Sequence, residues 1–243
     1  MKKKIVLAVT AFVISAVFIV CLLLVNGVIL FNHPSKEVYP VRGVDVSAYQ
    51  GKILWDVLSR QKIQFAYIKA TEGSTSQDKR FSYNWKNASK TSLRIGAYHF
   101  FSYDSSGEAQ AENFIHTVPK IEYMLPPVVD IEFYGEKEKN PPKREQVQKN
   151  LNELLRAMEK HYGIKPIIYA TQKSYDLYIK NSYQQYNIWI RNVFWKPELS
   201  DHRIWTFWQY SDRARMSGYD GAEKYIDMNV FNGTTDEFDN YYR

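Results

Sequence analysis

The chain has 243 residues, of which 45% are hydrophobic and 24% charged, and this balance excludes a wholly disordered chain and a coiled coil. The single cysteine, Cys21, excludes a disulfide framework and a cysteine-rich zinc site. The formal net charge is +6, but Lys2, Lys3 and Lys4 precede the first apolar segment, and the +3 that remains is too weak to indicate nucleic-acid binding. That mild excess suits an anionic polymer as substrate.

Residues 5–31 contain no charged side chain and would reach roughly 40 Å as a helix, more than the hydrocarbon core of a bilayer. We therefore interpret residues 1–31 as cytoplasmic lysines followed by a transmembrane signal-anchor, with the rest of the chain outside the cytoplasm, in the periplasm or at the cell surface. The alternative is a cleaved signal peptide and a secreted protein, although such peptides usually have only about 7–15 apolar residues.

Residues 32–40, which include Pro34 and Pro40, are predicted to form a short polar linker. The remaining residues, 41–243, contain no second linker, repeat or low-complexity tract, and we expect them to form one domain.

Apolar and β-branched runs alternate with helical patterns through most of this domain. Strands are predicted at 41–49, 64–71, 94–102, 126–133, 165–171, 187–193, 203–211 and 225–233. The first five are each followed by a helix, and no helix is predicted after residue 181. The alternation predicts a parallel α/β sheet, and the number of strands predicts closure into an irregular TIM-like barrel with five β/α units followed by three strands. An open doubly wound sheet is the alternative, but no Gly-rich phosphate loop follows the first strand.

Several predicted strands carry polar residues at their carboxyl ends, where the active site of an α/β barrel lies. These residues are Asp45, Glu72, Tyr98, His99, Asp130, Glu132, Tyr169 and Asp227. Acidic groups converge without a histidine cluster, which favours carboxylate acid–base chemistry over metal, phosphoryl or thiol chemistry. We therefore expect no metal and no cofactor.

The most informative pattern is Asp130-Ile131-Glu132. Because strand side chains alternate, the two acids share one face, with Cα atoms roughly 6.5–7 Å apart. Each then raises the pKa of the other, and one is expected to stay protonated as a general acid. A solvated strand edge or a metal-binding pair is the alternative. The apolar flank from Pro126 to Val129 argues against the edge, and the lack of histidines argues against the metal.

Other polar and aromatic residues have simpler interpretations. His99, between two aromatic residues, is expected to be a hydrogen-bonded core histidine, and Glu72 could cap the next helix. Most of the late tryptophans are expected to pack in the barrel; they are Trp189, Trp205 and Trp208. Three aspartates are interpreted as surface charges: Asp56, Asp176 and Asp212.

Seven segments together resemble the lysozymes (N-acetylmuramidases) of glycoside hydrolase family 25. They are Gly43–Gly51, Tyr67–Gly73, Gly96–Phe100, Val129–Glu132, Ile168–Ala170, Trp208–Ser211 and Ile226–Gly233. The resemblance covers about Arg42 to Gly233 and implies a barrel with five β/α units and three closing strands, in agreement with the strand count above. It also implies cleavage, with retention of configuration, of the β-1,4 bond between N-acetylmuramic acid and N-acetylglucosamine in peptidoglycan.

The resemblance also assigns roles to residues. Glu132 matches the catalytic acid/base, and Asp130 matches the carboxylate that stabilises the developing cation or an oxazolinium ion. Asp45 and Asp227 match two further active-site aspartates. Tyr98 and Tyr169 match groove residues of the family. The further candidate substrate contacts are Glu72, Trp189 and Gln209. One departure from the family pattern is the Ile190–Val193 segment after Trp189, where an Ala-x-Tyr-like segment is common.

Two other functions compete with a muramidase that binds peptidoglycan strands and is held in the membrane through residues 5–31. One is a non-catalytic barrel that binds the cell wall, against which the presence of all four acids argues. The other is a glycosidase acting on another N-acetylated glycan. Its catalytic strand would usually carry a longer acidic run, and Val128 and Val129 occupy those positions here.

Overall fold

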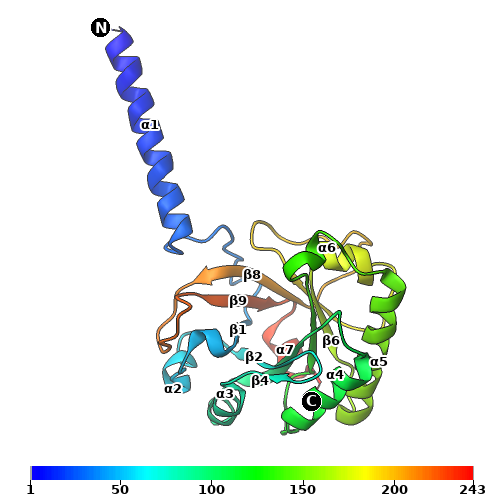
Figure 1. Ribbon diagram of the computed structural model, residues 1–243. Coiled ribbons are helices and arrows are strands. Elements are labelled where there is room, and N and C mark those ends of the chain that lie inside the picture. The colour runs from blue at the N-terminus through cyan, green and yellow to red at the C-terminus, as the bar shows by residue number, and fades with distance from the viewer. Residues whose placement is uncertain (1, 243) are drawn as a thin grey trace.

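Helix α1 (Lys2–Val25) projects from the rest of the molecule in this computed structural model (Figure 1). The structure describes residues 2–242, so Met1 and Arg243, the outer ends of the predicted anchor and barrel segments, lie outside the described residues. No residue of α1 is buried, and the helix is long and apolar enough to cross a membrane. The predicted apolar segment continues to Phe31, but the helix ends six residues earlier. At its end the side-chain amide of Asn26 donates to the carbonyl of Leu22, and Gly27 adopts a φ of +59°.

Eight strands close into a barrel, as predicted. They are β1 (Arg42–Val46), β2 (Phe65–Glu72), β4 (Arg94–Phe100), β5 (Val128–Ile131), β6 (Ile167–Thr171), β7 (Ile188–Arg191), β8 (Phe207–Ala214) and β9 (Ile226–Phe231). All neighbouring pairs from β1 through β8 are parallel, and the ring closes where β9 runs antiparallel to both β8 and β1. A two-residue strand, β3 (Ser76–Gln77), forms a hairpin with the end of β2.

Helical segments follow each of the first five barrel strands, and the longer helices lie around the outside of the ring (Figure 1). They are η1 (Ala48–Gln50), α2 (Trp55–Leu58), α3 (Phe81–Ala88), α4 (Gly107–Thr117), η2 (Gly135–Glu138), α5 (Arg144–Tyr162), α6 (Gln172–Ser174) and η3 (Tyr175–Ile179). The expectation that no helix follows residue 181 is wrong, because α7 (Thr235–Asp239) follows β9. Five residues are too few for a periodic pattern, although Thr234 and Glu237 form a capping box.

The strands separate two apolar layers. Val129 and Ile131 belong to the layer between the strands and the helices, whereas Val128 belongs to the layer inside the barrel. This alternation along β5 places the side chains of Asp130 and Glu132 on the inner face, at the carboxyl end of the ring.

Gly96 leaves room for the ring of Tyr67 inside the barrel, since an added Cβ would lie 2.3 Å from Cε1 of that ring. We expect Gly96→Ala to lower the free energy of unfolding by about 1–3 kcal/mol, the usual cost of overpacking. Urea titrations of both single variants and of the double variant with Tyr67→Leu would test the cause. The alanine should cost less once the ring is gone, and strictly additive losses would contradict this explanation.

Candidate active site

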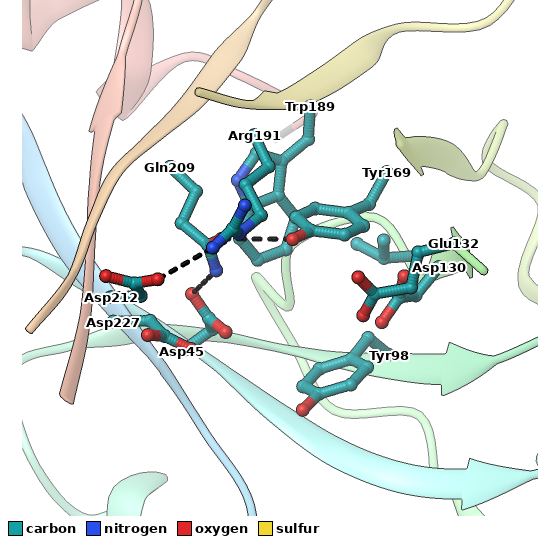
Figure 2. A pocket seen from close by; sticks show the side chains of 11 residues that line it. Asp45, Tyr98, Asp130, Glu132, Tyr169, Trp189, Arg191, Gln209, Asp212 and Asp227 are labelled. Atoms are coloured by element: carbon teal, nitrogen blue, oxygen red, sulfur yellow. Dashed lines mark hydrogen bonds and ion pairs between the residues drawn. The ribbon is translucent and has the colours of Figure 1, made fainter. Parts of the chain in front are cut away.

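The predicted acids surround one groove at the carboxyl ends of the strands. Two adjoining cavities of about 220 and 400 Å³ share Asp45, Tyr98, Asp130, Glu132, Asp212 and Asp227. The smaller cavity is also lined by Val128, Tyr169, Trp189, Arg191 and Gln209. Figure 2 shows two acidic groups, with Asp130 and Glu132 on one side of the cavity and the three other aspartates on the opposite side. The strand pattern thus brings together every predicted site residue except Glu72.

Asp130 and Glu132 share a raised tendency to hold a proton. Burial raises the pKa of Asp130 well above its ordinary value, and the charge of Glu132 adds to this effect. Burial also raises the pKa of Glu132, while the charge of Arg191 opposes it. Within the described residues, the buried Oδ1 of Asp130 accepts no hydrogen bond. This side of the groove therefore combines a carboxyl pair that favours protonation with one acceptor oxygen that has no donor.

Two side-chain amides fix the position of Asp45. Its Oδ2 accepts hydrogen bonds from Nε2 of Gln209 at 2.9 Å and from Nδ2 of Asn229 at 2.7 Å. The hydroxyl of Tyr169 donates to Oε1 of Gln209 at 3.0 Å, and the indole Nε1 of Trp189 donates to Oδ1 of Asn229 at 2.9 Å. Because each amide oxygen is occupied by a donor, each amide NH₂ must face Asp45.

Asp45 and Asp227 interact directly through their side chains. Burial raises the pKa of both, but the two amide donors partly offset this for Asp45. The charge and hydrogen bond of Asp45 raise the pKa of Asp227 further. We infer that the shared proton resides on Asp227 and that Asp45 is the ionised member, since its charge already has two donors.

No group of three or more potential metal-ligating side chains lies close enough together to hold an ion within residues 2–242. The polar groups that line the two cavities are carboxylates, hydroxyls, side-chain amides, the ammonium of Lys69 and the guanidinium of Arg191.

The sequence profile of Glycosyl hydrolases family 25 matches residues 44–219. The chain belongs to glycosyl hydrolase family 25. A family 25 glycosyl hydrolase from Bacillus anthracis has a similar structure, with a TM-score of 0.84, 58% identity, and coverage of 88% of this chain and 98% of that one. A lysozyme from Streptomyces coelicolor has a TM-score of 0.73 and 32% identity, covering 81% and 94% of the two chains. Lysozyme M1 of Streptomyces globisporus is 33% identical over 80% of this chain and 68% of its own length. The protein is thus a glycoside hydrolase of the lysozyme type.

The groove of the family 25 enzyme also contains two residues that the sequence did not predict as site residues. Arg191 and Asp212 line the smaller cavity, and Nη2 of the arginine lies 2.7 Å from Oδ2 of the aspartate (Figure 2). Interpreting Asp212 as an isolated surface charge was wrong. Arg191 could have been found, because it is two residues beyond Trp189 on β7 and so shares its face. Register shifts on either side of Ser211 break the alternation, so the face of Asp212 was not predictable.

Glu72 lies beside the acid-lined cavities of the family 25 enzyme and not in them. Its carboxylate is 2.7 Å from Nζ of Lys69, which lines the larger cavity and lies 4.8 Å from the centre of the Phe100 ring. Glu72 itself lines two shallower neighbouring cavities. It does not cap a helix, since the next one begins at Phe81. A direct contact with substrate stays a prediction.

The simpler interpretations of His99 and the tryptophans are confirmed. His99 is fully buried and bonded to Thr71 at 2.7 Å and Gln110 at 3.0 Å, and burial lowers its pKa to about 4. The indoles of Trp205 and Trp208 are buried and donate to backbone carbonyls.

Asp227→Asn should change how the stability of the family 25 enzyme depends on pH. The pKa of Asp227 is raised above its ordinary value of 3.8 in the folded chain. The stability that its protonated form contributes is therefore full below about pH 4 and is lost as the pH rises towards the folded pKa. Asparagine cannot ionise, yet its amide can still donate to Asp45.

The free energy of unfolding of Asp227→Asn, relative to that of the parent, should therefore be higher at about pH 8 than at about pH 5. Urea titrations at both pH values would measure this, with Asp56→Asn on the exposed face of α2 as a control. A difference between Asp227→Asn and the parent that is independent of pH would contradict the assigned proton.

Proposed function

We propose that the protein is a peptidoglycan muramidase that cleaves the β-1,4 bond between N-acetylmuramic acid and N-acetylglucosamine with retention of configuration. The observation that carries the proposal is the Asp130–Glu132 pair, whose pKa values are raised in the groove of a family 25 barrel. Relatives from two Streptomyces species are named lysozymes, which supports peptidoglycan as the substrate.

In the first step, Glu132 donates its proton to the glycosidic oxygen while the bond from that oxygen to C1 breaks. The 2-acetamido oxygen of the sugar that contains this C1 attacks C1 and forms an oxazolinium ion. Because the pair shares a proton, Asp130 is ionised when Glu132 carries it. Asp130 then supports this step, because its free Oδ1 can accept the acetamido N–H and its negative charge stabilises the cation.

In the second step, Glu132 acts as a base and removes a proton from water, which attacks C1 from the face that the leaving group vacated. The oxazolinium ring opens, and the acetamido group is restored. Two inversions at C1 give net retention. Because the nucleophile belongs to the substrate, the two carboxylates need not have the spacing of about 5–5.5 Å that a protein nucleophile requires.

The opposite wall of the groove supplies a second charge. Asp45, held by two amides and by protonated Asp227, places a fixed negative charge across the cavity from Glu132. Burial keeps the pKa of Tyr98 well above its ordinary value, so its hydroxyl stays a neutral donor in the groove. We assign these groups to holding the sugar and stabilising positive charge at C1.

Digestion of purified peptidoglycan tests the function, with the products identified by mass spectrometry after borohydride reduction. Fragments with muramic acid at the reducing end support it, and proton NMR of the first products should show the β-anomer. Binding without release of fragments would instead support the non-catalytic barrel. Cleavage of chitin oligosaccharides in preference to peptidoglycan would favour the glycosidase for another N-acetylated glycan.

We propose further that α1 remains as an anchor and holds the barrel outside the cytoplasm, at the cell surface or in the periplasm. Support comes from the triple lysine in the first turn of α1, a helix of 24 residues that carries no other charge. After carbonate extraction of membranes, full-length protein should stay in the pellet. Recovery of only a shortened, soluble form would show instead that the segment is a cleaved signal peptide.

A further inference from the structure

The segment after α1 does not extend away from the helix but folds back beside its last turn. The amides of Val28 and Ile29 donate to the carbonyl of Leu23 at 2.9 and 3.4 Å. Phe31, two residues after Ile29, is 52% exposed. Because of this fold-back, the apolar side chains that follow α1 stay near its carboxyl end, where an α1 that spans a bilayer would leave the hydrocarbon core.

The barrel holds this segment at two places. Nη1 of Arg213 and the hydroxyl of Tyr225 both donate to the carbonyl of Val25, at 2.9 and 3.0 Å. Nε of Arg215 donates to the carbonyl of Asn26 at 2.8 Å. Donors and cations at the carboxyl end of a helix stabilise it, so α1 is attached to the β8–β9 side of the barrel (Figure 1).

An aromatic cluster forms the second contact. The ring of Phe194 packs edge-on against Phe31 at 5.2 Å, and Trp195 lies 5.8 Å from Phe194. The two loop residues are 56% and 66% exposed. Oδ1 of Asn192 accepts the amide hydrogens of both, which fixes the turn that presents them. These three rings form a continuous exposed apolar patch at the base of an apolar helix.

We propose that Phe31, Phe194 and Trp195 insert into the interfacial layer of the bilayer that holds α1, so that the barrel rests on the membrane surface. The bilayer is the occupant that the structure favours, because the patch is continuous with a helix that has no buried residue. Aromatic rings are enriched at this depth in membrane proteins, where an apolar ring meets the headgroups. The proposal rests on α1 remaining in the bilayer but not on the proposed catalytic reaction.

One consequence concerns access to the groove. Tyr225 binds the end of α1 and also lines the larger acid-lined cavity, together with Glu223. The rim of the groove therefore lies next to the anchor. A barrel that rests on the membrane in this way receives glycan strands that lie close to the bilayer.

Fluorescence quenching in vesicles tests the proposal with the full chain. In a Cys21→Ala background, Trp195→Cys is labelled with bimane, and the protein is reconstituted into equal parts of phosphatidylglycerol and phosphatidylcholine. The matched control is Lys86→Cys, an exposed position on α3. Helix α3 lies on the side of the barrel away from α1 (Figure 1). Phe194→Cys serves as a second probe position in the patch.

Lipids with a nitroxide near the top of the acyl chain should quench bimane at positions 195 and 194 several-fold more than at position 86. Equal quenching at all three positions, in protein that floats with the vesicles, would overturn the membrane-resting barrel and leave the anchor intact. Protein that does not float would overturn both. Neither result depends on whether peptidoglycan is cleaved, which is measured separately in detergent.

Discussion

Glu132→Gln should lower kcat on purified peptidoglycan by about 10²–10⁴-fold, the usual contribution of general acid catalysis. Glutamine keeps the size and hydrogen-bonding capacity of the side chain, but it cannot deliver a proton to the glycosidic oxygen. Binding of peptidoglycan should persist, because the walls of the groove are unchanged. Initial rates of fragment release and co-sedimentation with insoluble peptidoglycan would measure the two effects separately.

The matched control for this substitution is Glu136→Gln on η2, where the parent side chain is 75% exposed and pairs with Lys139. We expect the control to keep the activity of the parent chain. Near-normal turnover by Glu132→Gln would contradict the proposed mechanism. Loss of both binding and turnover would indicate that the substitution has changed the structure of the groove.

Asp130→Asn should lower kcat by about 10²–10³-fold, the loss that follows removal of one group that stabilises charge in a transition state. Asparagine retains an oxygen that can accept the acetamido N–H, but it removes the negative charge beside the cation. The impairment should therefore be found on peptidoglycan and also on a glycoside with an activated phenol leaving group. Initial rates on both substrates, with Asp56→Asn as the matched control, would measure it.

The activated substrate separates the roles of the two acids. A phenolate leaves without protonation, so its release should be rescued in Glu132→Gln far better than in Asp130→Asn. Equal failure of both variants on this substrate would contradict the assignment of roles. Rescue of Asp130→Asn alone would reverse it.

Much of the fold follows from local patterns in the sequence. The eight barrel strands overlap the strands that the apolar runs predicted. Helix α5 ends before Gly163, which adopts a left-handed conformation at the C-cap. The alternation along β5 also placed Asp130 and Glu132 in one groove. These features depend on side-chain periodicity and on glycine conformation, and both can be read from a short stretch of sequence.

The remaining parts of the site depend on contacts between distant segments. Asn229 had no predicted role, because its role is to donate a hydrogen bond to Asp45, which is 184 residues away in the sequence. Asp212 was misread because the register of β8 shifts beside it. The predicted linker at residues 32–40 contains Tyr39, which packs against both Trp205 and Trp208 and is only 6% exposed. Periodicity carries no information about such pairings.

The ring of strands closes at the same place where Asp45 obtains its partners. Asp45 is on β1, while Asp227 and Asn229 are on β9, which is the last of the eight barrel strands in chain order. A chain emerging from the ribosome amino end first therefore exposes the Asp130–Glu132 pair long before the opposite wall of the groove exists. The hydrolase cannot assemble its full set of acids until β9 has been synthesised and has left the ribosome. The order of synthesis thus delays glycoside hydrolase activity until the barrel is closed.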